Sequence, residues 1–138
     1  VAARHPEKFA IRIGFDEGLS HRIEAGYDFF IMPSRFEPCG LNQMYSLRYG
    51  TIPIVRAVGG LSDSVVDLRE DAALANGIKF YQYDSAALVK GVRKALALYE
   101  NPPLRSQFRK NGMLADFSWD RTAEEYLKLY EQSTGRRK

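Results

Sequence analysis

The stretch 34–41, Ser-Arg-Phe-Glu-Pro-Cys-Gly-Leu, places the carboxylate of Glu37 close to Gly40. It follows the apolar run 29–32 and precedes a segment with helical spacing, so it is predicted to be a strand-to-helix turn. In open α/β sheets, ligands bind at the carboxyl ends of the strands. Gly40 lets the backbone approach a ligand closely, and the following helix offers free N–H groups to a phosphate. A carboxylate beside such a turn suits a substrate that carries phosphate and hydroxyl groups, such as a nucleotide-sugar.

The spacing of apolar residues predicts that strands and helices alternate along the chain. Gly50 is expected to end the second helix. Strands and helices of these lengths favour an α/β fold with a parallel, doubly wound sheet flanked by helices. The expected strands are 9–13, 28–32, 52–56 and 78–81, and the expected helices include 18–25, 40–49, 62–68 and 104–113.

The same patterns predict how some of these elements are capped and packed. The second strand is almost wholly apolar, so both of its faces should be covered. Ile23 is expected to face inward from the first helix. Ser85 and Ser118 are expected to cap two later helices. Their apolar faces are predicted to consist of Leu88, Val92, Ala95, Leu96 and Tyr99 in one helix, and of Trp119, Ala123, Tyr126, Leu127 and Tyr130 in the other.

Three predicted turns carry most of the residues that could contact a ligand. They are 14–17, 37–41 and 58–61, and each follows the carboxyl end of an expected strand. Because the strands should be parallel, all three turns are expected to open on the same edge of the sheet. That arrangement would place an aromatic ring, a carboxylate and two glycine-containing turns around one crevice.

Each of these features also has a simpler structural interpretation. Glu37 could only be stabilised by the dipole of the following helix. The pair Gly59 and Gly60 could be a tight turn without a ligand, and Phe15 could be a core residue. Cys39 precedes a helix, which lowers the pKa of some thiols, but no basic partner for nucleophilic catalysis is apparent.

Composition and charge narrow the class of protein. The chain has 138 residues, enough for one domain, of which 45% are hydrophobic and 27% charged. The net charge is +3, partly from the tail 136–138. Nucleic-acid-binding proteins more often show a basic stripe interleaved with exposed aromatic residues, so no nucleic-acid partner is expected.

Other residue types argue against several kinds of site. The single cysteine, Cys39, excludes an internal disulfide. His5 and His21 lack the spacing of metal ligands, so no metal is expected. No apolar run approaches the roughly 20 residues of a membrane span, so no membrane association is expected. Because the chain begins at Val1 without a methionine, we expect it to be a piece of a longer protein.

The central motif extends through Asn42 and Gln43, and as a whole it resembles a known enzyme family. Together with 49–53 and 59–61, the segment 34–43 closely resembles the bacterial glycogen synthases and plant starch synthases. The match extends over nearly the whole chain through the segments 14–15, 20–23 and 116–119.

This resemblance implies part of a GT-B glycosyltransferase, an enzyme of two Rossmann-like domains with the active site between them. The chain would be the latter part of the C-terminal, donor-binding domain, incomplete over 1–138. The implied reaction is the retaining transfer of glucose from ADP-glucose to the non-reducing end of an α-1,4-glucan, without a cofactor. The resemblance also implies a location in the bacterial cytoplasm or, for a plant protein, in the plastid stroma.

The resemblance also implies roles for individual residues. Glu37 would be the catalytic residue that contacts the donor glucose and offsets positive charge at its anomeric carbon. Phe15 would face the adenine. The remaining substrate-binding residues would line the sugar and phosphate site or close the pocket around the nucleotide, and they are Cys39, Gly40, Leu41, Asn42, Gly59, Gly60 and Leu61.

Two departures from the wider glycosyltransferase pattern limit what the chain alone should do. Many related glycosyltransferases carry a second glutamate where this chain has Tyr45, which supports the narrower glycogen and starch synthase family. The acceptor-side motif and a cationic pair for the phosphates would lie before Val1, so the isolated chain is expected to be inactive.

An exposed sheet edge could also allow a homo-oligomer.

Two alternative functions remain open from the sequence. The chain could be a non-catalytic Rossmann-like interaction module without a surviving ligand site. It could also belong to a UDP- or GDP-sugar transferase of the same fold, because one aromatic ring stacks on any base.

Overall fold

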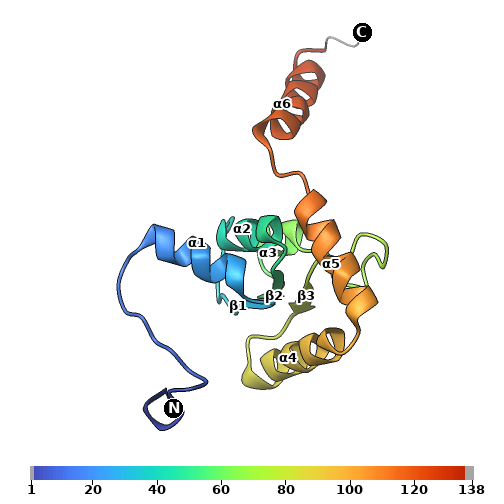
Figure 1. The fold of residues 1–138 in the computed structure, drawn as a ribbon. Coiled ribbons are helices and arrows are strands. Elements are labelled where there is room, and N and C mark those ends of the chain that lie inside the picture. The colour runs from blue at the N-terminus through green and yellow to red at the C-terminus, as the bar shows by residue number, and fades with distance from the viewer. Residues whose placement is uncertain (1, 136–138) are drawn as a thin grey trace.

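A computed structural model describes residues 2–135 and contains one three-stranded sheet (Figure 1). All neighbouring strands run parallel, in the order β1–β2–β3. In the register of the sheet, Phe29 of β1 lies opposite Ile52, and Ile54 lies opposite Ile78. The strands are β1 (Phe29–Met32), β2 (Ile52–Arg56) and β3 (Ile78–Phe80).

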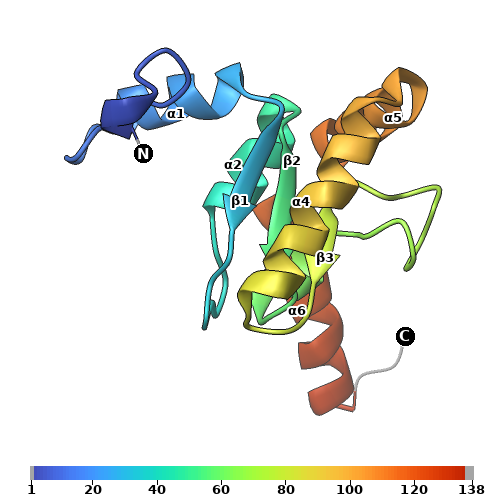
Figure 2. The same ribbon diagram turned by 90° about the horizontal axis from the view of Figure 1, so that it is seen from below.

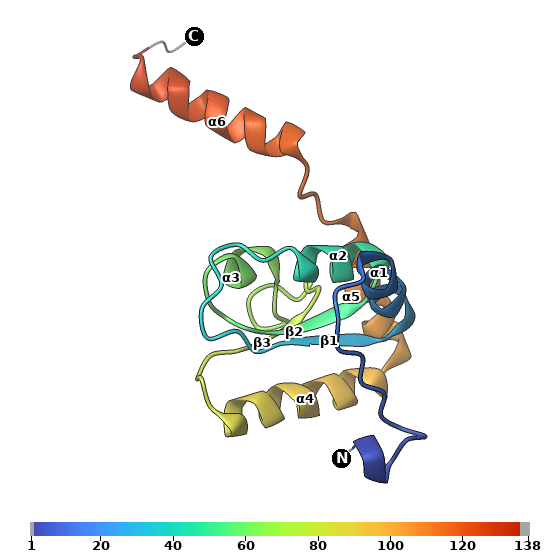
Figure 3. The ribbon, with the colours of Figure 1, turned by 90° about the vertical axis from the view of Figure 1, so that its left-hand side faces the viewer.

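Helices lie on both faces of this sheet. Figure 3 shows α2 (Asn42–Tyr49) and α3 (Gly60–Ser64) on one face and α4 (Ser85–Tyr99) on the other. A further helix, α5 (Pro102–Leu114), contacts both α2 and α4. The expected fold class, a parallel α/β sheet flanked by helices, is therefore confirmed. None of the described helices is long and apolar enough to cross a membrane.

The core lies on the two faces of β2, whose apolar side chains alternate between them. Ile54 belongs to a cluster with Phe80 and with residues of α4 and α5, including Phe108. Val55, on the opposite face, packs with Leu61 and Val65 beneath α3. The central strand is thus covered on both sides, which holds the loops at its carboxyl end in place.

The two ends of the described chain lie apart from this core. A short 3₁₀ turn, η1 (Ala2–Arg4), and an irregular segment lead to α1 (Glu17–Gly26), which packs against α2. The last helix, α6 (Trp119–Ser133), extends away from the sheet (Figure 1). It has no buried residue. Its expected cap is confirmed, because Ser118 Oγ accepts a hydrogen bond from the Arg121 N–H. The basic tail at 136–138 lies outside the described residues.

The strand expected at 9–13 is wrong. This segment is irregular, and Ile11 and Ile13 are 74% and 93% exposed. Figures 1 and 2 show that it runs away from the sheet. A strand needs a neighbour to pair its backbone N–H and C=O groups, and this segment has none among residues 2–135.

The expectation that β1 is covered on both faces is also wrong. Ile31 is 45% exposed, and the other three residues of β1 are only half-buried. The reason is that β1 is an edge strand, with β2 on one side and no further strand on the other within the described residues.

The first helix begins and ends within one residue of its expected bounds, but it turns a different face inward. Ile23 is 47% exposed, whereas Glu24 is only 3% exposed. In this structure α1 packs against α2 rather than against a sheet, and this contact selects a different side of the helix.

The third helix is shorter and earlier than expected, because α3 ends at Ser64 rather than near residue 68. Side chains satisfy the backbone groups that follow it. Asn76 Oδ1 accepts a hydrogen bond from the Val66 N–H, and Asp67 Oδ1 accepts one from the Arg69 N–H. These side-chain bonds replace the helical ones and end the helix.

The fourth helix is capped one residue before the expected Ser85. The Asp84 carboxylate accepts a hydrogen bond from the Ala87 N–H at 2.7 Å. Leu96 and Tyr99 are exposed rather than part of the apolar face. The sheet instead contacts a neighbouring side of α4, and the buried residues of this helix are Ala87, Gly91, Ala95 and Leu98.

Candidate functional site

The first glycine turn, residues 37–41, lies between β1 and α2. Gly40 has a φ of +74°, a conformation that other residues rarely adopt, and a Cβ atom added there would overlap Gln43 Oε1. Leu41 provides no side-chain cap to α2. The first N–H groups of the helix therefore remain available to an external acceptor.

The second glycine turn, residues 58–61, lies between β2 and α3 and contacts the first turn directly. A Cβ atom added at Gly59 would overlap the carbonyl oxygen of Glu37, and one added at Gly60 would overlap that of Cys39. The Gly60 N–H also donates a hydrogen bond to the Pro38 carbonyl at 3.2 Å. Glycine is needed at both positions because two backbones touch here.

The Glu37 side chain is half-buried at this junction. It takes part in none of the salt bridges found in residues 2–135. Its carboxylate is thus not neutralised by a cation of this part of the chain. Such a group can accept hydrogen bonds from sugar hydroxyls or face a developing positive charge.

The other expected substrate-binding residues occupy different environments. Cys39, Leu41 and Asn42 are exposed at the first turn. The Cys39 thiol donates a long hydrogen bond of 3.6 Å to the Gly40 carbonyl. Leu61 is fully buried in the core beneath α3, so only its backbone could contact a ligand.

Phe15 is not brought to the two glycine turns. Its side chain is 96% exposed, and the segment before α1 lies away from the sheet (Figure 2). The expectation that three turns share one edge is wrong for 14–17, because no strand precedes that turn. Sequence reasoning thus correctly joined the turns after β1 and β2 but not the turn at Phe15.

A hollow of about 420 Å³ opens beside both glycine turns. Pro38, Cys39 and Gly60 form one part of its wall. Phe117 and Arg121, at the start of α6, form another part. Its volume falls within the range of roughly 300–1,000 Å³ that is common for small-molecule sites.

Arg56 links the loops that follow all three strands, a role that sequence reasoning missed. Its guanidinium donates hydrogen bonds to the carbonyl oxygens of Tyr81 (3.2 Å) and Arg35 (2.9 Å). The guanidinium also lies 5.4 Å from the centre of the Tyr83 ring. Arg56 is the last residue of β2, and this position at the carboxyl edge of the sheet was the sequence signal that could have indicated its role. These contacts steady the loop that leads to Glu37.

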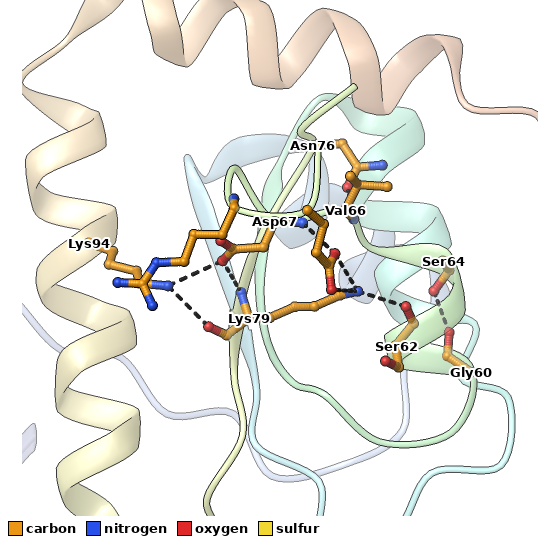
Figure 4. Close-up of polar contacts among 10 residues, drawn as sticks. Gly60, Ser62, Ser64, Val66, Asp67, Asn76, Lys79 and Lys94 are labelled. Atoms are coloured by element: carbon orange, nitrogen blue, oxygen red, sulfur yellow. Dashed lines mark hydrogen bonds and ion pairs between the residues drawn. The ribbon is translucent and has the colours of Figure 1, made fainter. Parts of the chain in front are cut away.

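An ion pair between the buried Lys79 and the partly exposed Glu70 lies behind the second glycine turn (Figure 4), and it too was missed. The side chain of Lys79 is 3% exposed, and its Nζ donates hydrogen bonds to the Ser62 carbonyl at 2.7 Å and to both carboxylate oxygens of Glu70. Burial alone would raise the pKa of Glu70, but the hydrogen bonds from Lys79 and from the Asp67 N–H, together with the charge of Lys79, lower it. Through the bonds of Lys79 to Ser62 and Glu70, the pair holds α3 against β3.

Asp67 extends this network toward α4. Its carboxylate accepts hydrogen bonds from the Lys79 N–H at 2.8 Å and from Lys94 Nζ at 3.2 Å. Burial would raise the pKa of Asp67, but the hydrogen bonds from the Lys79 and Arg69 backbones, together with the charge of Lys94, lower it. A lysine inside a three-residue apolar strand was the only sequence signal of this network. Within the described residues, no group of three or more His, Cys, Asp or Glu side chains could hold a metal ion.

The chain is similar in sequence to enzymes named glycogen synthase. The enzyme from Myxococcus xanthus is 54% identical over 130 residues, which are 94% of this chain and 26% of that protein. The enzyme from Koribacter versatilis is 47% identical over 133 residues, 96% of this chain and 28% of that protein. The chain thus spans about a quarter of the length of these relatives.

The fold is similar to that of solved glycosyltransferase structures. The catalytic domain of starch synthase IV from Arabidopsis thaliana, solved with ADP and acarbose, has a TM-score of 0.77 and 41% identity. The comparison covers 89% of this chain and 26% of that one. A sucrose-phosphate synthase from Thermosynechococcus elongatus shares the fold, with a TM-score of 0.68 and 24% identity over 97% of this chain and 33% of that one.

These similarities confirm the resemblance to glycogen and starch synthases. Residues 11–114 match the family described as glycosyl transferases group 1. This match contains all three strands and both glycine turns. Since it covers well over half of the chain, the protein belongs to the glycosyl transferases group 1 family.

Proposed function

We propose that this chain forms the donor-binding part of a retaining glucosyltransferase, which transfers glucose from ADP-glucose to the non-reducing end of an α-1,4-glucan. The observation that carries the proposal is the contact between the two glycine turns beside the half-buried carboxylate of Glu37. The similarity to glycogen synthases, and to a starch synthase solved with ADP, supports this choice of donor and acceptor.

The chemistry of glucosyl transfer explains why such a site suits this reaction. Breaking the bond between the anomeric carbon and the phosphate oxygen creates positive charge on the sugar and a departing diphosphate. Glu37 accepts hydrogen bonds from the donor glucose and offsets the positive charge. The uncapped N–H groups at the start of α2 face the negative charge of the diphosphate. Fixed groups of this kind need little rearrangement during the reaction.

The remaining residues contribute to this site in different ways. Cys39, Gly40, Leu41 and Asn42 line the sugar and phosphate positions along the first turn. The second turn, with Gly59, Gly60 and the backbone of Leu61, closes the site from the other side. Phe15 faces the adenine only when the segment before α1 is brought to the sheet edge by other parts of a complete enzyme.

The chain is an incomplete C-terminal domain in this proposal. The glucan acceptor and the cationic partners of the diphosphate belong to parts of the enzyme outside residues 1–138. The exposed apolar face of α6, with Trp119 and Tyr126, packs against the other domain in a complete enzyme. A bacterial parent acts in the cytoplasm and a plant parent in the plastid stroma.

Amide NMR spectra of the chain, recorded during separate titrations with ADP, ADP-glucose, UDP and UDP-glucose, test the donor site. We expect shifts at Gly40 and Gly60 with the ADP ligands and weaker ones with the UDP ligands. Stronger shifts with UDP ligands would instead favour a transferase of another nucleotide-sugar. Silence toward all four ligands in a folded sample would contradict donor binding by this chain and favour an interaction module.

Substitutions in the first turn sharpen this test. Glu37→Ala should weaken the binding of ADP-glucose more than the binding of ADP, because only ADP-glucose carries the sugar. Gly40→Pro should abolish the shifts from both ligands, since proline cannot adopt a φ of +74°. Glu124→Ala on α6 is the control, because it removes an exposed carboxylate far along the chain from the turns. Equal ligand affinity in all three variants would contradict the proposed site.

A further inference from the structure

The side chain of Gln43 is fully buried at the start of α2, where it contacts the first glycine turn and α3. Its Nε2 atom donates hydrogen bonds to the carbonyl oxygens of Cys39 (3.1 Å) and Gly40 (2.9 Å) in the first turn. The same atom donates a hydrogen bond of 3.1 Å to Ser64 Oγ, at the end of α3. One amide group thus links the first turn to the helix that follows the second.

Ser64 completes the connection to the second turn. Its Oγ donates a hydrogen bond of 2.6 Å to the Gly60 carbonyl (Figure 4) and accepts the one from Gln43. On the other side, the Gly60 N–H returns to the first turn by its hydrogen bond to the Pro38 carbonyl. The two turns are therefore joined by a closed loop of hydrogen bonds that runs through two side chains.

The burial of both side chains makes this link hard to replace. Gln43 is 0% and Ser64 6% exposed, and the carbonyl groups that they bind are only partly open to water. Loss of a partner is costly for a partly buried carbonyl, and the turns would have to move to recover a hydrogen bond of the same geometry. The backbone of Gly59 and Gly60 touches the backbone of the first turn, and this contact limits how closely the two turns approach. The hydrogen bonds of Gln43 and Ser64 keep them from separating.

We propose that Gln43 and Ser64 are positioning residues, which set the spacing of the two glycine turns and thereby the affinity for the donor. The Gln43 side chain is fully buried, and the Ser64 hydroxyl, at the wall of the hollow, is engaged in its two hydrogen bonds within the protein. The first turn carries Glu37, and the second carries Gly60, so a change in their spacing misaligns the sugar relative to the nucleotide. The effect on the donor rests on the proposed function, whereas the link between the turns does not.

A matched pair of serine substitutions tests the link without any ligand. Ser64→Ala removes the hydroxyl that joins the turns. Ser46→Ala removes another buried hydroxyl, which lies on α2 and has no hydrogen-bond partner among the described residues. Hydrogen exchange of the Gly60 amide, measured by NMR, should be about two- to tenfold faster in Ser64→Ala and unchanged in Ser46→Ala. Equal exchange in the two variants would overturn the link.

Steady-state kinetics test the positioning role in a complete glycogen synthase that carries this sequence as its matching segment. Ser64→Ala should raise the KM for ADP-glucose about fivefold and leave the KM for glucan unchanged. Ser64→Thr, which keeps the hydroxyl, should restore the donor KM, and Ser46→Ala should leave it unaltered. Gln43→Met should raise it further, because it leaves three acceptors without their donor.

The outcomes separate this proposal from the function on which it rests. Melting temperatures of the variants show whether each enzyme is folded before its kinetics are compared. An unchanged donor KM in folded Ser64→Ala, with faster exchange at Gly60, would overturn the positioning role. Equal increases in the KM for donor and glucan would overturn it as well. If the chain bound neither the ADP nor the UDP ligands, the proposed function would be contradicted, but the hydrogen-bonded link between the turns would be unaffected.

Discussion

Gly40 and Gly14 both have positive φ angles and both lie shortly before a helix, but their surroundings differ. The backbone at Gly40 touches Gln43, and the turn around it contacts the second glycine turn. A Cβ atom added at Gly14, by contrast, would meet nothing within 4 Å. The neighbouring aromatic residue, Phe15, is almost fully exposed.

The difference comes from the strands that precede the two turns. The strand before Gly40 pairs with β2, and this pairing brings its turn beside the turn that follows β2. The segment before Gly14 pairs with no strand in residues 2–135. A strand-to-helix turn thus forms a candidate ligand site only when the neighbouring strand of the sheet brings a second turn beside it.

Removing Glu70 should cause the largest loss of stability, because it leaves a buried lysine of the packed region without its carboxylate partner. Glu70→Ala leaves the Lys79 ammonium 3% exposed and without its carboxylate. Because Glu70 is itself 39% exposed, solvent screens part of the effect, and we expect the free energy of unfolding to fall by about 2.5 kcal/mol in urea denaturation followed by circular dichroism.

Glu7→Ala is the matched control in the isolated N-terminal region. Within residues 2–135, Glu7 forms its single ion pair with His5, at 3.9 Å, and both side chains are exposed. The change should stay within about 0.5 kcal/mol. Equal losses in the two variants would remove the contrast between the regions.

Gly60→Ala should have the next largest effect, since its methyl group would overlap the Cys39 carbonyl in the first turn. We expect a loss of about 2 kcal/mol, from the strain of separating two backbones. Gly26→Ala, at the end of α1, adds the same methyl group to open space and should stabilise the chain slightly. Thermal unfolding of both variants measures the difference. A neutral Gly60→Ala would show that the turns are not in contact.

Acid should weaken the packed region through Asp67. Hydrogen bonds hold its pKa below its ordinary value of 3.8, so its contribution to stability is present above that pH and is lost as the pH falls through the lowered pKa. Asp67→Asn should lower stability by about 1.5 kcal/mol at pH 7 and by less below pH 3.8. Melting temperatures between pH 3 and pH 8 measure this dependence.

Glu24 on α1 should show the opposite pH dependence. Burial raises its pKa above the ordinary value of 4.5, an effect that the nearby His21 reduces only in part. Its contribution is therefore present below pH 4.5 and is lost as the pH rises through the raised pKa. Glu24→Gln should raise the melting temperature at pH 7 and leave it unchanged at pH 4. If Asp67→Asn and Glu24→Gln changed the melting temperature with pH in the same direction, the opposite pKa shifts of these two carboxyl groups would be contradicted.

The smallest effect should come from shortening an isoleucine in the N-terminal segment. Ile13→Val removes one methylene from a side chain that is 93% exposed, so the urea midpoint should not change. Ile54→Val removes the same group from a side chain that is 2% exposed and should cost about 1 kcal/mol. A measurable loss from Ile13→Val would mean that this segment packs in solution.

Local signals were enough for much of the fold. The bounds of β2 matched the expected 52–56, and Gly50 ends α2 in the left-handed conformation that its position suggested. Ser118 caps α6 as expected. These features succeed because the interactions that create them lie within a few residues of one another.

Errors arose where a distant contact decided the outcome. The alternating residues at 9–13 have the pattern of a strand but no partner among the described residues. Ile23 has the spacing of an inward residue, but α1 lies against α2 and buries Glu24 instead. Nothing near Lys79 in the sequence indicates its partner Glu70, which the fold brings beside it.

The sequence by itself determined the order of the strands and helices after residue 17, and the presence of a carboxylate and glycines in the turns after β1 and β2. Only the tertiary structure decided which turns meet. The hydrogen bond between Gln43 and Ser64 joins residues 21 positions apart. No local spacing predicts such a contact, because it depends on which strands lie side by side and on how their helices cover the sheet.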